Sequence, residues 1–279
     1  MTRKLWFLVA GCLLSVSLVL AACGDDDDDG SGDDNAEVQA FFDQLVADFN
    51  AGDAEVFAAN FDDESLIAFI GEDEVTTREA ATEAIAGRME SIQVELLAVK
   101  DVAQSGDDTT AGIELAVQGT VAAESYVLTP EGDGFLITGY EQTNPDIPDG
   151  VTPFEVTGQD FEYVFEGGDA EGGVEAIVFT NEGEQFHEIA LLKAAEDAPE
   201  LDTIIEDALG AEGPEDLPDS IEAFVAVAFA APGESTNMVL VDPLESGRYV
   251  MVCFIPDETQ GEERPPHAAL GMAAEFTVE

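Results

Sequence analysis

Residues 247–278, GRYVMVCFIPDETQGEERPPHAALGMAAEFTV, are the stretch that decides the fold of the second half of the chain. The stretch begins as an apolar strand pattern that carries Cys253. It continues through an acidic loop that ends in two prolines, then reaches His267 and Met272 before a last strand pattern. Thiolate, imidazole and thioether ligands together favour copper over other metals. We therefore expect Cys253, His267 and Met272 to be metal ligands.

A fourth ligand is available earlier in the chain. The sequence contains 2 histidines, and the first, His187, lies in FTNEGEQFHEIALLK. Each candidate also has a plainer interpretation. Cys253 alternates with other strand residues and is suited to a core, His187 is suited to a strand edge, and Met272 lies near apolar neighbours. Metal binding would protect a lone thiol from oxidation, which favours the metal site.

Residues 154–279 resemble a cupredoxin, the blue-copper β-sandwich domain. That family takes its first histidine from a strand after an Asn-Gly-type turn, and Asn181, Gly183 and His187 match this part. Its cysteine, second histidine and methionine come from the loop that joins the last two strands, as in the stretch quoted above. The resemblance implies a Greek-key sandwich, one copper ion, and single-electron transfer with a redox protein partner.

Two features depart from the cupredoxin pattern. Thirteen residues separate Cys253 from His267, far more than in plastocyanin-like proteins, and Glu188 stands where many relatives carry asparagine. Two other functions stay open beside electron transfer. One is copper carriage or sensing, and the other is a metal-free domain that binds partners or cell-envelope ligands.

The start of the chain is typical of a bacterial lipoprotein. Residues 1–22 combine two early cations with a short apolar stretch, and Leu20-Ala21-Ala22-Cys23 resembles a lipobox. We expect Cys23 to carry the lipid that holds the protein on the extracytoplasmic face of the membrane. Residues 23–35 would then be the lipidated cysteine and an extended acidic tether. A plain signal peptide or a buried helix is the alternative.

The charge of the chain excludes one class of partner. Against 62 acidic residues stand 8 lysines and arginines, which gives a formal net charge of −54. Such a chain repels phosphate backbones, so we expect no nucleic acid partner. An acidic face could dock a basic redox protein, but the acids are spread evenly along the chain. That distribution favours a surface adapted to high salt.

The chain divides at residues 144–153, NPDIPDGVTP, where prolines and a glycine predict a linker. Residues 36–143 form the first predicted domain. Helical periodicity and capping residues predict helices over 36–49, 54–60 and 78–90, the last of them capped by Thr77. Alternating patterns then predict strands over 92–102, 110–117, 122–129 and 135–141.

Helices followed by a curved antiparallel sheet predict an α+β cone. The segments FFDQLVADFNAGDAEVFAANF and REAATEAIA resemble the NTF2-like or SnoaL-like superfamily, which contains both enzymes and binding modules. This domain has no histidine or cysteine, and most of its acids fall in turns or on polar faces. Tyr126 and Tyr140 are suited equally to a cavity and to a core. We therefore expect a ligand-binding or protein-contact module and no enzyme.

The second domain begins with alternating strand patterns. We expect strands over 174–180, 186–193, 223–230, 236–241 and 248–255, and a helical insertion over 201–209 with one apolar face. Many short strands separated by glycine and proline turns predict a sandwich.

Overall fold

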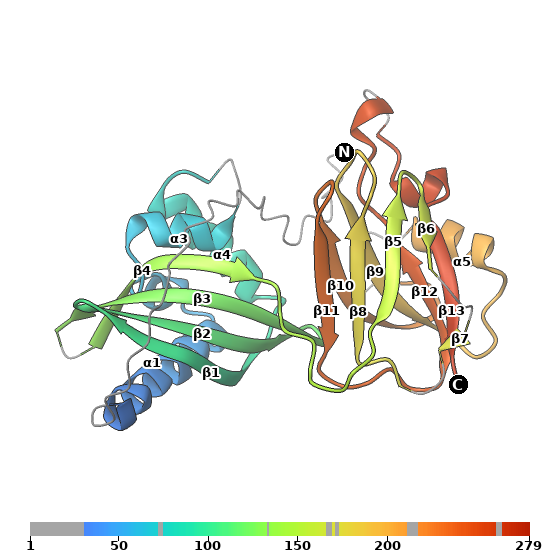
Figure 1. Cartoon of the computed structure of the whole chain (residues 1–279). Coiled ribbons are helices and arrows are strands. Elements are labelled where there is room, and N and C mark those ends of the chain that lie inside the picture. The colour runs from blue at the N-terminus through green and yellow to red at the C-terminus, as the bar shows by residue number, and fades with distance from the viewer. Residues whose placement is uncertain are drawn as a thin grey trace. The chain divides into compact units, whose positions relative to one another are not determined.

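The computed structural model describes residues 31–71, 75–132, 134–165, 169–170, 173–210, 217–260 and 264–279 (Figure 1). The predicted signal peptide, Cys23 and most of the predicted tether lie outside the described residues. By their contacts, the described residues separate into two compact units. The first contains residues 31–117 and 122–143, and the second contains residues 118–121 and 144–279.

Helices come first in the first unit: α1 (Ser31–Ala51), α2 (Ala54–Ala58), α3 (Asp63–Ile70) and α4 (Arg78–Met89). The predicted cap of the last helix is confirmed, because the Thr77 hydroxyl accepts a hydrogen bond from the Ala80 N–H. Helix α3 was not expected from the sequence, although Asp62 caps its start and Gly71 ends it in the left-handed conformation. Within the part of the chain that the structure describes, no helix is long and apolar enough to cross a membrane.

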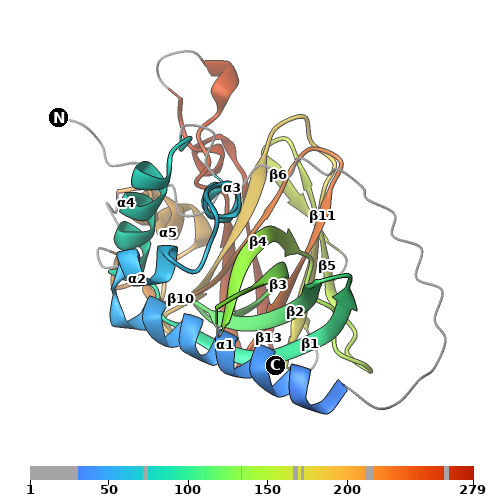
Figure 2. The ribbon, with the colours of Figure 1, turned by 90° about the vertical axis from the view of Figure 1, so that its left-hand side faces the viewer.

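The sheet of the first unit pairs in chain order. Its antiparallel strands are β1 (Val94–Ser105), β2 (Asp108–Val117), β3 (Thr120–Glu131) and β4 (Gly134–Thr143). All four were predicted, and all extend beyond the predicted runs. Helix α1 lies along this sheet in Figure 2, and its Phe42 ring packs 5.0 Å from the ring of Tyr126 on β3. Helices and sheet thus enclose one aromatic core.

The second unit is built from two groups of strands. One group pairs in the order β11 (Ser235–Leu240), β8 (Ala176–Asn181), β5 (Phe154–Gln159) and β6 (Glu162–Val164). The other pairs in the order β10 (Ile221–Ala230), β9 (His187–Ala194), β12 (Gly247–Val252), β13 (Ala273–Val278) and β7 (Asp169–Ala170). Pairing is antiparallel except between β5 and β8 and between β13 and β7.

One core lies between the two groups of strands. Buried side chains from both groups share it, including Phe179 of β8, Leu191 of β9 and Met251 of β12. The outer face of the second sheet is covered as well. Helix α5 (Leu201–Ala208), the predicted insertion, packs Ile204 and Ile205 in a second buried cluster with residues of β9 and β12. Burial on both faces explains why these strands are almost continuously apolar.

Candidate metal centre

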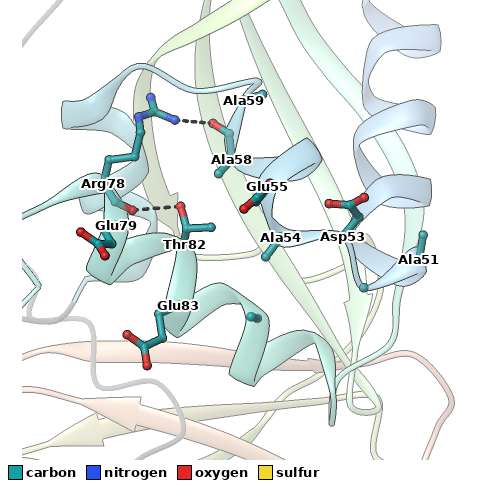
Figure 3. Close-up of a pocket in the computed structure, with 12 residues that line it drawn as sticks. Ala51, Asp53, Ala54, Glu55, Ala58, Ala59, Arg78, Glu79, Thr82 and Glu83 are labelled. Carbon is teal, nitrogen blue, oxygen red and sulfur yellow. Dashed lines mark hydrogen bonds between the residues drawn. The ribbon is translucent and has the colours of Figure 1, made fainter.

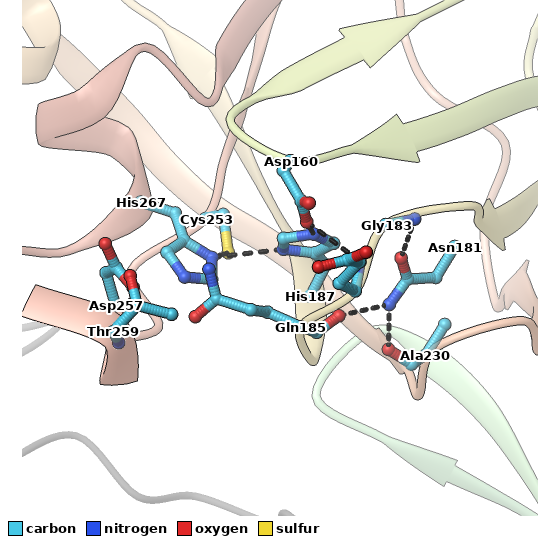
Figure 4. Close-up of polar contacts among 11 residues, drawn as sticks. Asp160, Asn181, Gly183, Gln185, His187, Ala230, Cys253, Asp257, Thr259 and His267 are labelled. Atoms are coloured by element: carbon cyan, nitrogen blue, oxygen red, sulfur yellow. Dashed lines mark hydrogen bonds and ion pairs between the residues drawn. The ribbon is translucent and has the colours of Figure 1, made fainter.

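Three side chains that could hold a metal ion converge at one end of the second unit. One ligand atom each from His187, Cys253 and His267 lies within 4.8 Å of the other two. The Nδ1 atoms of the two histidines are 3.0 Å apart, and the Cys253 Sγ lies 3.4 Å from the His267 Nδ1 (Figure 4). All three residues have 0% exposed surface. The sequence therefore identified residues that the fold brings together from positions up to 80 apart.

Two ligands lie on segments that the backbone holds side by side. Cys253 follows the end of β12, and His267 opens a short 3-10 helix, η3 (His267–Leu270). The Ala268 N–H donates to the Cys253 carbonyl oxygen at 2.8 Å, and the Cys253 N–H donates to the Met272 carbonyl oxygen at 3.2 Å. Helix α5 packs Ile204 into the same buried cluster as Ala268, so the insertion supports the segment that carries His267.

The long loop between the two ligands is closed near its base. The His267 N–H donates to the Ile255 carbonyl oxygen at 2.8 Å, and the Asp257 N–H donates to the Pro265 carbonyl oxygen at 2.9 Å. Pro256 and Pro266 form an isolated antiparallel bridge. The connection from Cys253 to His267 is therefore short in space despite its length in sequence.

A turn before β9, held by the Asn181 side chain, positions His187. The Asn181 side chain donates to the carbonyl oxygens of Gln185 and Ala230, each at 2.8 Å, and its Oδ1 accepts from the Gly183 N–H at 2.8 Å. Because Asn181 is fully buried and its amide makes all three bonds, the turn has one defined shape. The sequence pattern of Asn181, Gly183 and His187 is therefore explained by the geometry of this turn.

Met272 is fully buried, and its backbone is hydrogen-bonded to both loop ligands. Its N–H donates to the His267 carbonyl oxygen at 3.0 Å, and its carbonyl oxygen accepts from Cys253, as described above. The side chain belongs to the same core cluster as Cys253. A Cβ added at Gly158 would lie 2.8 Å from the Phe179 ring and 3.4 Å from the Met272 methyl group, so this glycine leaves room for the ring that packs beside Met272.

Glu188 ties two parts of the site together. Its Oε1 accepts a hydrogen bond from the Phe254 N–H at 2.7 Å, which links β9 to the residue after Cys253. The Tyr163 hydroxyl donates to the Glu188 backbone carbonyl oxygen. Burial raises the pKa of the Glu188 carboxyl to about 7, and the bond from Phe254 offsets part of this effect. Glu188, which stands where many cupredoxins carry asparagine, therefore provides a cross-link and a titratable group.

Of the three candidate ligands, the two imidazoles have pKa values that suit metal binding near neutral pH. Burial, together with the nearby His187, lowers the pKa of His267 to about 4. Burial also lowers the pKa of His187, while the hydrogen bond to Asp160 opposes that change. Burial raises the pKa of the Cys253 thiol, and the negative charge of Glu188 adds to the effect. Both imidazoles are thus neutral near pH 7, and the thiol keeps its proton until a metal displaces it.

The donor set fits a copper ion. Two imidazole nitrogens and one sulfur at these separations can share one ion at bond lengths of about 2.0–2.3 Å. Blue-copper sites use two histidines and a cysteine as their short ligands and a methionine as a weak ligand. The site is also closed to bulk water, since all four residues have 0% exposed surface.

Two groups escaped the sequence analysis. The first is Asp160, whose carboxylate lies 3.3 Å from the Nε2 of His187. The second is Glu124 on β3, which is buried in the first unit and accepts hydrogen bonds from Tyr126 at 2.5 Å and Tyr140 at 3.1 Å. Burial raises the pKa of Glu124. The Asp160 contact does not follow from local spacing, whereas Glu124 and Tyr126 lie two residues apart on one strand and therefore share a face, which was a usable signal.

The first unit also has a shallow hollow of about 900 Å³, bordered by the end of α1 and by α2 and α4 (Figure 3). Its rim is acidic, with Asp53, Glu55 and Glu79 among its residues. The Arg78 guanidinium at its edge is already bonded to the Asp63 carboxylate and to the Ala58 carbonyl oxygen. The hollow is therefore lined by carboxylates and small alanine side chains, and its one arginine is already engaged in an ion pair.

Comparisons with known proteins give only weak likenesses. No family model matches the chain, and no curated protein matches it. Dithionite-reduced auracyanin from Roseiflexus castenholzii is 24% identical over 47% of this chain and 99% of its own, with a TM-score of 0.30. An NTF2-like protein with a cystatin-like fold from Novosphingobium aromaticivorans is 17% identical over 39% of this chain and 80% of its own, with a TM-score of 0.33.

A domain of unknown function with a cystatin-like fold from Nostoc punctiforme gives a similar result. It is 18% identical over 41% of this chain and 78% of its own, with a TM-score of 0.32. At such scores the likenesses do not assign a function.

Proposed function

We propose that this protein binds one copper ion at His187, Cys253 and His267 and carries single electrons. One observation supports the proposal above the others: the convergence of two imidazole Nδ1 atoms and one thiol sulfur in a fully buried pocket. When bound, copper would supply a one-electron couple between its divalent and monovalent states. The proposal includes the Greek-key cupredoxin fold for the second unit.

Met272 favours copper over zinc as the occupant. A structural zinc site has four cysteine, histidine or carboxylate ligands, and thioethers are suited to copper instead. The next donor available at this site is the buried Met272, whose backbone is hydrogen-bonded to both loop ligands. We propose that Met272 would be the weak fourth ligand and that the other three residues would be the short ligands.

The chain's own residues then keep the site rigid. The Asn181 turn fixes the start of β9, the Glu188 carboxyl links that strand to Phe254, and the bridge between Pro256 and Pro266 fixes the approach to His267. A rigid cage requires little rearrangement when the charge of the ion changes, which suits electron transfer. Burial of all four proposed ligands excludes water as a competing ligand.

The location and partner of the protein are also proposals. The lipobox-like sequence before Cys23 supports a lipid anchor on the extracytoplasmic face of the membrane. Such an anchor would keep the copper domain near a membrane and near a redox protein partner. For the first unit we propose a binding or contact role without catalysis, since aromatic rings fill its interior between Phe42 and Tyr140.

The proposal is tested by adding Cu(II) to purified full-length protein in detergent and recording the absorption spectrum and the metal content. We expect about one copper per chain and a strong visible band from the thiolate. Cys253→Ser should abolish the band, because it removes the sulfur. His187→Ala should weaken binding strongly, because it removes one of three short ligands.

Cys23→Ser is the control for the proposed anchor, because it removes a cysteine outside the described residues and leaves all four candidate ligands in place. It should leave the colour unchanged while removing the proposed site of lipid attachment. A Cys253→Ser protein that binds copper with the wild-type spectrum would exclude the proposed centre. Tight Cu(I) binding without a reversible Cu(II) state would instead indicate copper carriage.

A further inference from the structure

Asp160 contacts the ring nitrogen of His187 that points away from the metal cluster. Its Oδ1 accepts from the His187 Nε2 at 3.3 Å and from the Glu184 N–H at 3.0 Å. The Nδ1 of the same ring faces His267. The imidazole is therefore held between a carboxylate on one side and the other ligands on the opposite side, as Figure 4 shows.

The backbone at Gly183 packs closely against this contact. A Cβ added at Gly183 would lie 2.5 Å from the Asp160 Oδ1 and 2.6 Å from the His187 Nε2. Real Cβ atoms essentially never come so close to other heavy atoms. The backbone at Gly183 thus covers the contact, and the Asn181 side chain fixes that backbone by accepting the Gly183 N–H.

The contact differs from an ordinary surface ion pair. His187 has 0% exposed side chain, and the pair joins the β5–β6 turn to the start of β9, 27 residues away in sequence. A neutral imidazole that donates from Nε2 keeps its lone pair on Nδ1, which is the atom that faces the cluster. A carboxylate on the remote nitrogen of a metal-bound histidine also raises the basicity of the ligand.

We propose that Asp160 is a positioning residue of the copper centre. It would hold His187 as the Nε2–H tautomer, and its negative charge would favour the divalent over the monovalent ion. This inference rests on the proposed copper function. Because the Asp160 side chain is 38% exposed, solvent screens its charge, and orientation of the ring is the larger effect.

The tautomer can be measured without copper. Nitrogen-15 NMR of the imidazoles in the full-length apo protein should show His187 as a single Nε2–H tautomer. In Asp160→Ala we expect a mixture of tautomers. Asp160→Asn keeps an oxygen that can accept the same hydrogen bond, so this variant should retain most of the wild-type tautomer while losing the charge.

The loaded protein gives a second measurement. Loss of such a partner typically weakens metal binding by about 10–100-fold. We expect Asp160→Ala to lose Cu(II) affinity in that range and to lose less Cu(I) affinity. Each tenfold fall in the ratio of Cu(II) affinity to Cu(I) affinity raises the reduction potential by about 59 mV. Glu182→Gln is the matched control, since it removes an exposed carboxylate from the same turn as Gly183.

The outcomes separate this inference from the function on which it rests. If the wild type shows no thiolate band with Cu(II), the copper function fails, and the tautomer still decides whether Asp160 positions His187. If the wild type is coloured but Asp160→Ala keeps both its tautomer and its ratio of Cu(II) to Cu(I) affinity, the inference is overturned. Equal potential shifts in Asp160→Asn and Glu182→Gln would likewise reject the specific effect of charge at Asp160.

Discussion

Gly183→Ala should damage the metal centre although it adds only one methyl group. The new Cβ would lie 2.5 Å from the Asp160 Oδ1 and 2.6 Å from the His187 Nε2, so one of these atoms must move. Overpacking a well-packed site typically costs about 1–3 kcal/mol. For a unit of this size that corresponds to a fall in the melting temperature of roughly 3–12 °C.

The loss of copper affinity should exceed what destabilisation alone explains. We expect the variant to lose the bond between Asp160 and His187 and with it about 10–100-fold in affinity. At saturating copper this is about 1.4–2.7 kcal/mol less stabilisation by the metal. The assay is thermal unfolding of apo and copper-loaded protein, followed by circular dichroism, together with a competition titration for copper affinity.

Two glycine variants calibrate the result. Gly173→Ala places a Cβ 3.0 Å from the Pro243 Cβ, in the same unit but on residues that do not contact the ligands, so it should affect stability without changing copper affinity. Gly87→Ala lies in α4 with open space around it, and it should stabilise the protein by about 0.5–1 kcal/mol. A Gly183→Ala protein with wild-type copper affinity and stability would refute the reasoning from this contact.

Four further predictions concern the ligands, the protons and the charge. Met272→Leu should keep the copper and change its potential, measured by voltammetry, because the axial bond is long and the two side chains have similar volume. Copper uptake at pH 7 should release about one proton, measured by calorimetry in buffers of different ionisation enthalpy, because the pKa of Cys253 is raised and that of His267 is about 4. The buried Glu188 has a folded pKa of about 7, above its ordinary 4.5, so its contribution to stability is present below about pH 4.5 and is lost as the pH rises to about 7. Urea unfolding of the apo protein should show this loss, roughly 3 kcal/mol, in the wild type and not in Glu188→Gln. Removing salt should lower the melting temperature of the full-length protein, because a formal charge of −54 repels over longer distances in dilute buffer, and an equal melting temperature in molar KCl would contradict this.

Most helices and strands could be predicted because their signals are local. Thr77 precedes a periodic apolar pattern and caps α4 as expected. Helix α3 was missed even though Asp62 and Gly71 supply its capping signals, since its eight residues are too few for a clear apolar period. The strand bounds differ from the predicted runs by up to three residues in either direction, because pairing with neighbouring strands decides where a strand ends and no alternating pattern marks that point.

The buried polar groups could not be predicted in the same way. Glu124 stands on β3 opposite Gln142, and Tyr126 on the same strand stands opposite Tyr140. Only this register brings both hydroxyls to one carboxylate and makes its burial tolerable. Asp160 is similar, because its partner lies 27 residues away across two turns. A sequence shows which residues can pair, whereas the register decides which do.

The loop between Cys253 and His267 shows how sequence spacing can mislead about ligand geometry. Thirteen intervening residues suggest a site that is held loosely. In the structure the Ile255 carbonyl oxygen already accepts from the His267 N–H at 2.8 Å, so only one residue, Phe254, separates Cys253 from the point where the chain closes on the second histidine. The bridge between Pro256 and Pro266 fixes the two ends of the acidic segment between these prolines. We therefore expect that this segment can change in length without moving either ligand. The spacing that defines a metal site is thus the length of chain between its last fixed hydrogen bonds, and ligand order survives in the sequence where ligand spacing does not.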